Sequence, residues 1–244
     1  MQKYKLAIHS IETMGTLDGA GIRCVIFFQG CPLRCLYCHN PDTWGHNATG
    51  IEYDVYELLE KVLRNRFYFS RGGGVTFSGG EPLLQAANLV HLVECFINSN
   101  VNTLLDTSGC IYNNYVEEVI KKVDQIILDF KFPNEKDYFT YTKMHLSQFI
   151  LFIEKCRDFN KKIKLRTVIV PGINDKEEYL DQYIEVIKQY DHILEWELLG
   201  FHTMGFDKYE SLNIENPLKK YNALDSSTLE KLQIYVDSKM RYSK

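Results

Sequence analysis

Three cysteines lie within eight residues of this chain, on the segment 30–40 (GCPLRCLYCHN), which we call the cysteine loop. Their spacing is C-x3-C-x2-C, so Cys31, Cys35 and Cys38 can hold three corners of a 4Fe–4S cluster. Such clusters ordinarily take four cysteines, which leaves one iron here without a thiolate. An open metal position distinguishes catalytic sites from structural ones. The loop therefore predicts a reactive metal centre, around which the rest of the chain must be organised.

Two other interpretations of the cysteine loop stay open at this point. Cys31, Cys35, Cys38 and His39 form a ligand set that zinc accepts, and Cys35 with Cys38 has the spacing of a thioredoxin-like redox pair. Neither interpretation accounts for the polar residues found further along the chain. The other cysteines have no metal-like spacing and are expected as reduced thiols packed like small hydrophobic residues: Cys24, Cys95, Cys110 and Cys156.

Length and composition favour one domain. The chain has 244 residues, 45% of them hydrophobic, which suits a single domain over 1–244 with its core over about 16–240. A net charge of −4 argues against a general nucleic-acid-binding protein. No apolar run approaches the length of a transmembrane helix, and the first residues lack a secretory hydrophobic region. An odd number of cysteines and a cluster of three thiols fit a reducing cytoplasm.

Strands and helices are predicted to alternate along the chain. Strands are expected over 3–13, 22–29, 75–78, 101–106, 125–130, 164–170 and 195–199, and helices over 53–69, 84–98, 115–122, 148–160, 176–190 and 226–240. Ser226 or Ser227 is the predicted N-cap of the last helix, and 203–225 is expected as a polar loop. Repeated strand–helix units imply a parallel α/β sheet, and six units fit this length better than the eight of a full barrel. The predicted fold is a partial (β/α)6 barrel of the TIM type.

Polar residues gather at the carboxyl ends of the predicted strands. This position is shared by the cysteine loop, Gly79-Gly80-Glu81, Asp106-Thr107, Asp129, Lys131 and His202, whereas Arg166 lies inside a strand. In a parallel barrel these strand ends open on the face that carries the active site. Residues far apart in sequence are therefore expected to converge on one mouth.

Each of these residues also has an ordinary structural explanation. Gly79-Gly80-Glu81 can form a strand–helix turn, Asp106 and Asp129 can cap helices, and Lys131 can be a surface lysine. Arg166 needs a partner in its apolar strand, either a structural carboxylate or a ligand, because an unpaired buried charge is costly.

The chain resembles the radical S-adenosylmethionine (SAM) activases of glycyl radical enzymes, and among them the pyruvate formate-lyase type. The resemblance is carried by the cysteine loop with Tyr37 before its last cysteine, and by the segment 16–23 (TLDGAGIR). Further matching segments run through most of the chain: 8–10, 27–31, 42–44, 72–76, 78–81, 106–107, 128–129, 131, 166, 170–172 and 202. The 40 residues between Cys38 and Gly79 contain no cysteine, whereas many activases of other glycyl radical enzymes carry a ferredoxin-like insert.

Three departures from the family pattern concern loops. Ala20 and Gly200 stand where the family commonly has proline, and the segment 138–147 lacks an expected glycine. These differences bear on local loop geometry and on the choice of partner rather than on the chemistry.

The resemblance implies two cofactors, a 4Fe–4S cluster on Cys31, Cys35 and Cys38, and SAM. The implied SAM contacts are Tyr37, His39, Asn40, Gly79, Gly80, Glu81, Asp106, Asp129, Lys131, Arg166 and His202. A monovalent cation, Na⁺ or K⁺, is expected at Asp106, Thr107 and Asp129, because it would offset carboxylates that otherwise repel one another.

The resemblance also implies an oxidoreductase whose substrate is a protein. A 5′-deoxyadenosyl radical from SAM would remove a hydrogen atom from a backbone glycine of pyruvate formate-lyase, with Asp18 near the partner's glycine loop. A flavodoxin- or ferredoxin-type protein would donate the electron to a cytoplasmic, monomeric activase that needs neither nucleic acid nor membrane. Two alternatives stay open: an activase of another glycyl radical enzyme, such as anaerobic ribonucleotide reductase, and a non-catalytic zinc- or cluster-binding interaction module.

Overall fold

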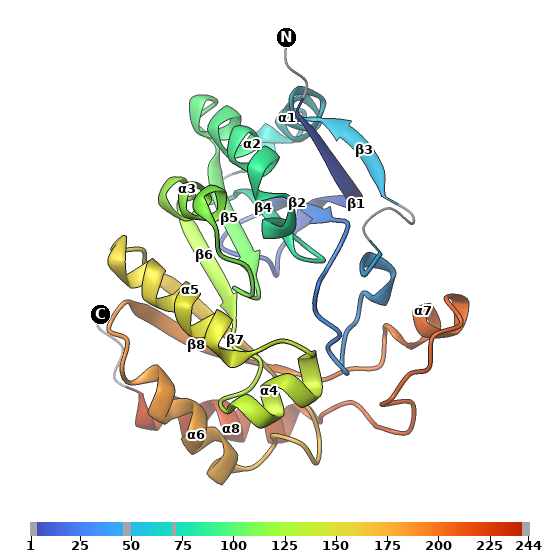
Figure 1. Ribbon diagram of the computed structural model, residues 1–244, viewed down its shortest axis with the longest axis vertical. Helices are drawn as coiled ribbons and strands as arrows, with labels where there is room; N and C mark the ends of the chain where they lie inside the picture. The colour runs from blue at the N-terminus through green and yellow to red at the C-terminus, as the bar shows by residue number, and fades with distance from the viewer. Residues whose placement is uncertain (1–3, 46–49, 70–71, 241–244) are drawn as a thin grey trace. The chain divides into compact units, whose positions relative to one another are not determined.

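The computed structural model describes residues 4–45, 50–69 and 72–240 (Figure 1). The chain forms two compact units, each assembled from separate stretches of sequence. The first unit contains Met1–Pro32 and Thr43–Ile127, and the second contains Leu33–Asp42 and Leu128–Lys244. The prediction of a single domain over 1–244 stays a prediction.

The strands of the first unit are β1 (Lys5–Gly15), β2 (Arg23–Phe28), β3 (Ile51–Asp54), β4 (Gly74–Gly79) and β5 (Asn102–Thr107). β1 pairs antiparallel with β2 and β3, whereas β2, β4 and β5 are parallel neighbours. Every residue of β2 except Phe27 is fully buried, as its continuous apolar run predicts. The short, half-exposed strand β3 was not predicted, because it has no apolar run or alternation to mark it.

The helices of the first unit are α1 (Val55–Leu63), α2 (Ala86–Asn98) and α3 (Asn114–Lys122), with short 3-10 turns η2 (Arg66–Tyr68) and η3 (Pro82–Gln85). A third such turn, η1 (Pro41–Thr43), follows the cysteine loop. α1 begins at a capping box formed by Asp54 and Glu57. The helix predicted over 53–69 is therefore shorter than expected at both ends.

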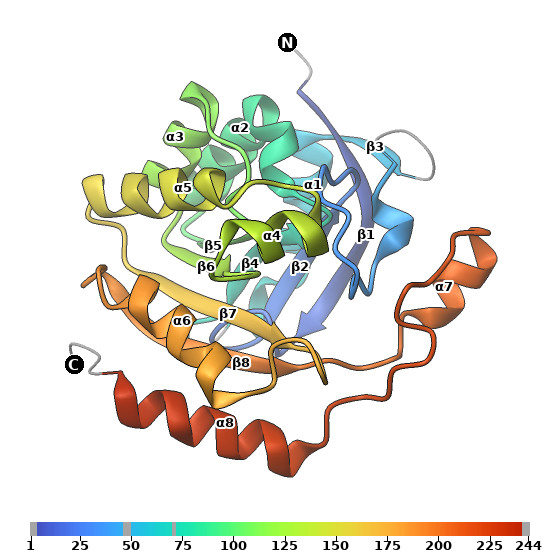
Figure 2. The same ribbon diagram turned by 60° about the horizontal axis from the view of Figure 1, so that its bottom comes forward.

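In the second unit, the described residues after β6 (Gln125–Asp129) form five helices and one pair of parallel strands. They are α4 (Glu135–Thr142), α5 (Leu146–Asp158), β7 (Ile163–Ile169), α6 (Glu177–Ile187), β8 (Ile193–Gly200), α7 (Phe206–Ser211) and α8 (Ser226–Lys239). Figure 2 shows α8 running along β8. Gln233 of α8 accepts a hydrogen bond from the Leu198 N–H at 2.8 Å and donates one to the Trp196 carbonyl at 2.9 Å. This side chain thereby pairs backbone groups that an edge strand otherwise leaves open.

Three local predictions for the second unit were wrong. The N-cap of α8 is Asp225, which accepts a hydrogen bond from the Thr228 N–H at 2.8 Å, while Ser226 is already helical. The segment 203–225 contains α7 and is not a simple loop. α4 lies where no helix was predicted, and its C-cap Lys143 has a φ of 65°. Lys143 thus occupies the left-handed conformation that glycine favours, within the segment 138–147 that lacks the expected glycine.

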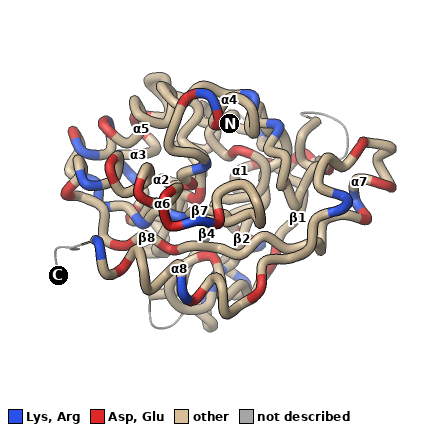
Figure 3. The backbone as a smooth tube through the Cα atoms, turned by 90° about the horizontal axis from the view of Figure 1, so that it is seen from below, with Lys and Arg blue, Asp and Glu red and all other residues tan. Residues whose placement is uncertain are grey.

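The strand order is β3-β1-β2-β4-β5-β6-β7-β8, where β6 (Gln125–Asp129) contains the boundary between the two units. Open strand order and alternation with helices confirm the α/β class and the partial barrel. Within the described ranges, none of the helices has the length and apolar content needed to cross a bilayer. Figure 3 shows Lys and Arg interspersed with Asp and Glu along the chain.

Candidate active site

The cysteine loop supplies reduced thiols. All seven cysteines lie in the described residues, and none of them forms a disulfide. Cys35 is buried, and its burial raises the pKa of its thiol to about 12. Cys31 belongs to the first unit, whereas Cys35 and Cys38 belong to the second. Within the described ranges, no group of three or more His, Cys, Asp or Glu residues is arranged so that it could hold a metal ion. Three reduced thiols on one loop are nevertheless the donors that an iron–sulfur cluster takes, so these ligands stay a prediction.

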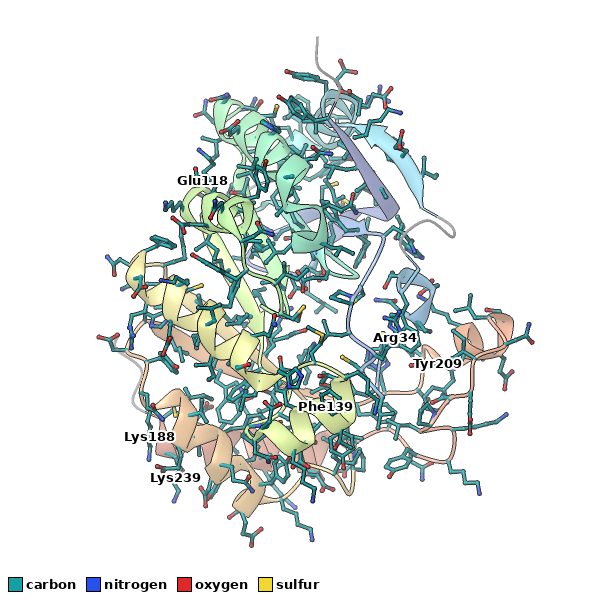
Figure 4. The ribbon with its side chains drawn as sticks, viewed as in Figure 1. Arg34, Glu118, Phe139, Lys188, Tyr209 and Lys239 are labelled. Carbon is teal, nitrogen blue, oxygen red and sulfur yellow. The ribbon has the colours of Figure 1, made fainter. Side chains whose placement is uncertain are left out.

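In the second unit the cysteine loop is bonded to α4. The Arg34 N–H donates to the Thr142 carbonyl at 2.8 Å, and the Leu36 N–H donates to the Tyr141 carbonyl at 2.9 Å. The last carbonyls of a helix have no partner inside the helix, so the loop satisfies the end of α4. Figure 4 labels Arg34 on the loop, Phe139 on α4 and Tyr209 on α7.

Among the buried polar atoms of the second unit that have no hydrogen-bond partner in the described residues, three lie on the cysteine loop or directly after β8. They are the Tyr37 hydroxyl, His39 Nε2 and His202 Nδ1. The two imidazoles are stacked, with ring centroids 3.6 Å apart and planes 14° from parallel. Burial, reinforced by the neighbouring His202, lowers the pKa of His39 to about 4, so its ring is neutral near pH 7. Because buried polar groups are nearly always paired, these atoms fit a polar ligand such as SAM.

Lys131 and Asp129 form a half-buried ion pair in the second unit. Lys131 Nζ lies 2.5 Å from Asp129 Oδ2, and the two side chains are 13% and 30% exposed. Burial alone would lower the pKa of Lys131, but the negative charge of Asp129 raises it well above its usual value. Asp129 is therefore no helix cap, and the N-cap of α4 is Asn134. Lys131 is not a surface lysine either, so it stays a candidate for the SAM carboxylate or ribose.

Arg166 on β7 has a carboxylate partner on the adjacent strand. Its Nε donates to Glu197 Oε2 at 2.9 Å, and the two residues are register partners in the β7–β8 pair. Of the two partners left open for this guanidinium, the structural carboxylate is therefore present. A contact between Arg166 and SAM stays a prediction.

In the first unit, Glu81 accepts four hydrogen bonds from groups of the protein itself. Its carboxylate is 1% exposed and accepts hydrogen bonds from the Thr107 hydroxyl at 2.6 Å and from the Ser108 hydroxyl and N–H at 2.5 and 3.0 Å. The Leu83 N–H donates a fourth bond at 3.1 Å. Burial raises the pKa of Glu81, and these bonds to the charged form oppose that shift. Glu81 thus ties the end of β4 to the end of β5, and its assignment as a SAM contact stays a prediction.

Glycine is required at positions 79 and 80 by the neighbouring backbone. Gly79 has a φ of +111°, and an added Cβ would lie 2.3 Å from the Phe28 nitrogen. A Cβ at Gly80 would lie 2.2 Å from the Gly30 carbonyl oxygen. The N–H groups of Gly80 and Glu81 donate to the Phe28 and Gly30 carbonyls at 2.9 and 2.8 Å. An ammonium group of SAM needs acceptors, so any bond to this turn would use its carbonyl oxygens.

The residues predicted to bind a cation are divided between the units, with Asp106 and Thr107 in the first and Asp129 in the second. Asp106 accepts a hydrogen bond from the Ser78 hydroxyl at 2.8 Å, and it caps no helix because α3 begins at its own cap, Asn113. The Thr107 hydroxyl donates to Glu81 and accepts from the Gly109 N–H at 3.1 Å. The cation site stays a prediction.

Asp18, the predicted partner contact, lies on a firmly held loop of the first unit. Its carbonyl accepts a hydrogen bond from the Thr76 hydroxyl at 2.8 Å, and that hydroxyl accepts one from Arg23 Nε at 2.7 Å. The Arg23 side chain is fully buried and also donates to the Gly72 carbonyl at 2.9 Å. The loop 16–22 is therefore held in place without any ligand.

Two residues of α7 that were not predicted as site residues, Lys208 and Tyr209, contact the cysteine loop. Tyr209 donates its hydroxyl proton to the Cys38 carbonyl at 3.0 Å, and Lys208 donates to Asn40 Oδ1 at 2.8 Å. No spacing or composition in 203–225 distinguishes these residues, because the contacts span about 170 residues of sequence.

Comparison with known proteins identifies relatives along nearly the whole chain. The family described as "4Fe-4S single cluster domain" matches residues 17–150. The pyruvate formate-lyase-activating enzyme of Clostridium pasteurianum is 44% identical over 230 residues, which cover 94% of this chain and 96% of that protein. The enzyme of the same name from Staphylococcus epidermidis is 38% identical, with 94% of each chain covered.

A solved structure agrees on the fold. The radical SAM methyltransferase from Sphaerobacter thermophilus superposes with a TM-score of 0.65 at 14% identity, covering 91% of this chain and 67% of that one. Fold and cysteine loop together define a radical SAM enzyme with a single 4Fe–4S cluster domain. Within that class, the chain belongs to the family of pyruvate formate-lyase-activating enzymes.

Proposed function

We propose that this protein activates pyruvate formate-lyase by generating a glycyl radical on it. The observation that carries the proposal is the C-x3-C-x2-C loop in a chain that is 44% identical to such an activase along 94% of its length. When bound, the 4Fe–4S cluster would supply one electron to SAM, which would release methionine and provide a 5′-deoxyadenosyl radical. Transfer of a hydrogen atom from the partner's glycine Cα would then give 5′-deoxyadenosine and a glycyl radical on the partner. Cys31, Cys35 and Cys38 would hold the cluster.

The second unit offers SAM a set of polar groups that are already oriented. Lys131 is held by Asp129 and keeps its positive charge, so it suits the carboxylate or ribose of SAM. The Tyr37 hydroxyl and His39 Nε2 are buried polar atoms in need of partners. A neutral His39 would add no positive charge to a site that binds the cationic SAM. These side chains would bind and orient SAM and exclude water from it.

The partner and the electron donor are proposed from the similarity to activases of glycyl radical enzymes. Asp18 would contact the glycine loop of pyruvate formate-lyase from a loop that Arg23 and Thr76 hold in place. A flavodoxin- or ferredoxin-type protein would donate the electron to a monomeric enzyme. Seven reduced cysteines are consistent with work in a reducing cytoplasm.

Anaerobic reconstitution tests this function. Protein loaded with iron and sulfide, reduced with dithionite and supplied with SAM should produce 5′-deoxyadenosine. A colourless protein that binds zinc and never cleaves SAM would instead support the interaction-module alternative. Production of 5′-deoxyadenosine without any glycyl radical on pyruvate formate-lyase would point to an activase of another glycyl radical enzyme.

A further inference from the structure

Helix α7 holds the residues that follow the last cysteine. Lys208 Nζ donates to Asn40 Oδ1 at 2.8 Å and to Asp42 Oδ1 at 3.1 Å. The next residue, Tyr209, donates its hydroxyl proton to the Cys38 carbonyl at 3.0 Å. Two consecutive side chains of one short helix therefore contact three residues within the segment 38–42.

The packing at the start of α7 is equally close. A Cβ added to Gly205 would lie 2.6 Å from the His39 carbonyl oxygen and 2.8 Å from the His39 Cα. His39 in turn stacks on His202, three residues before Gly205. The segment 202–209 thus contacts the ring of His39, its backbone and the residues on both sides of it.

The chemistry of these contacts fixes the orientation of the Asn40 side-chain amide. A lysine ammonium only donates hydrogen bonds, so the oxygen of the Asn40 amide faces Lys208 and its amino group points away. Lys208 and Asp42 are 35% and 21% exposed, where a charge-assisted bond is stronger than on an open surface. Tyr209 is 2% exposed, so its hydroxyl bond is shielded from water.

We propose that Lys208 and Tyr209 are positioning residues for the active site, which hold the segment 38–42 in the conformation that binds SAM. The inference rests on the proposed function, because that segment contains Cys38 and the predicted SAM contacts His39 and Asn40. Lys208 fixes the orientation of the Asn40 side-chain amide, and Tyr209 fixes the position of the Cys38 carbonyl. Neither residue takes part in the reaction itself.

The test measures SAM affinity in the reconstituted, reduced enzyme. Lys208→Met should weaken SAM binding about tenfold, which is the loss expected when one charge-assisted hydrogen bond no longer holds the site. The iron content and the temperature of unfolding should stay at wild-type values. Lys208→Arg should restore most of the affinity, because it keeps the charge and the donors. Lys219→Met is the matched control, since Lys219 also lies within 203–225 and forms an ion pair with Glu210 whose two side chains are 72% and 71% exposed.

A double-mutant cycle sharpens the test. Because Lys208 acts through Asn40, Lys208→Met should cost much less affinity in an Asn40→Ala background than in the wild type. Tyr209→Phe should alter the electron paramagnetic resonance spectrum of the reduced cluster, because the Cys38 backbone loses its hydrogen bond. Unchanged affinity in Lys208→Met, or equal losses in Lys208→Met and Lys219→Met, would overturn the inference. Failure of the wild-type enzyme to bind SAM would instead overturn the proposed function.

Discussion

Two regions of the molecule were predicted to contact SAM, and they differ in how their polar groups are satisfied. In the first unit, all the bonds around Glu81 are made within the protein, by Thr107, Ser108 and Leu83. In the second unit, the Tyr37 hydroxyl, His39 Nε2 and His202 Nδ1 are buried without a partner among the described residues. The two regions looked alike in sequence, since both consist of polar residues that follow strands or line the cysteine loop.

This difference separates residues that stabilise the fold from residues that await a ligand. A buried carboxylate with four donors contributes to stability whether or not SAM is present. A buried hydroxyl or imidazole nitrogen without a partner costs stability until a ligand pairs it. Substitution of Glu81 should therefore change the free energy of unfolding, and substitutions of Tyr37, His39 or His202 should mainly change ligand affinity.

The largest effect is expected at the cluster ligands. Cys35→Ala should abolish SAM cleavage, because three thiolates leave no spare ligand. Cys156→Ala is a closely matched control, since Cys156 is buried like Cys35 and burial raises the pKa of both thiols to about 12. It should keep the iron and the activity. Iron content and 5′-deoxyadenosine yield measure both. Loss of the cluster in Cys156→Ala but not in Cys35→Ala would show that the ligands are assigned wrongly.

The next largest effect is expected at Glu81. Glu81→Gln replaces one carboxylate oxygen by an amino group, and a donor then faces the donors of Thr107 or Ser108. The free energy of unfolding without cofactors should fall by about 2–3 kcal/mol, the cost of buried groups left unsatisfied. Urea unfolding measures it. Glu118→Gln, at a glutamate that is 48% exposed and labelled in Figure 4, should change stability by less than about 0.5 kcal/mol. Equal effects in the two variants would remove the distinction between the regions.

Tyr37→Phe should act in the opposite direction. Removal of a buried hydroxyl without a partner should leave the cofactor-free protein as stable or raise its free energy of unfolding by about 1 kcal/mol. SAM affinity should fall several-fold at the same time. Tyr183→Phe is the contrasting variant, because the Tyr183 hydroxyl donates to the Lys131 carbonyl at 2.7 Å, and its loss should destabilise the protein. A clear loss of stability in Tyr37→Phe would mean that its hydroxyl is already paired.

The smallest effect is expected outside both regions, at the end of α4. Lys143 has a φ of 65°, a conformation that glycine adopts without steric cost. Lys143→Gly should therefore leave stability unchanged or raise it by up to about 1 kcal/mol. Lys136→Gly, inside the same helix, should lower stability by about 1 kcal/mol. Thermal unfolding of the two variants distinguishes these outcomes, and a loss in Lys143→Gly equal to that in Lys136→Gly would contradict the conformational argument.

The sequence predicted those elements that have a strong local pattern. The apolar run of β2 and the spaced apolar residues of α1 are such patterns, and both elements were found. α4 buries only Tyr138 and Thr142, so it has no clear apolar face, and its end is satisfied by the backbone of Arg34 and Leu36. Helices defined by such distant bonds cannot be predicted from local periodicity.

The roles of individual site residues were less predictable than their positions. Glu81 lies where it was expected, at the end of a strand, but its partner Thr107 is 26 residues away. Lys208 meets Asn40 across 168 residues. Whether a polar side chain already has its hydrogen bonds depends on such distant partners. The sequence therefore identified candidate residues without distinguishing those that stabilise the fold from those that contact a ligand.

Hydrogen-atom transfer from the partner provides the most direct test of the whole account. Pyruvate formate-lyase prepared with glycine deuterated at Cα should be mixed anaerobically with the reconstituted, reduced enzyme and SAM. Mass spectrometry of the 5′-deoxyadenosine should then show one deuterium, while electron paramagnetic resonance shows a glycyl radical on the partner. Unlabelled 5′-deoxyadenosine, or no cleavage of SAM by a protein that has its cluster, would contradict the account.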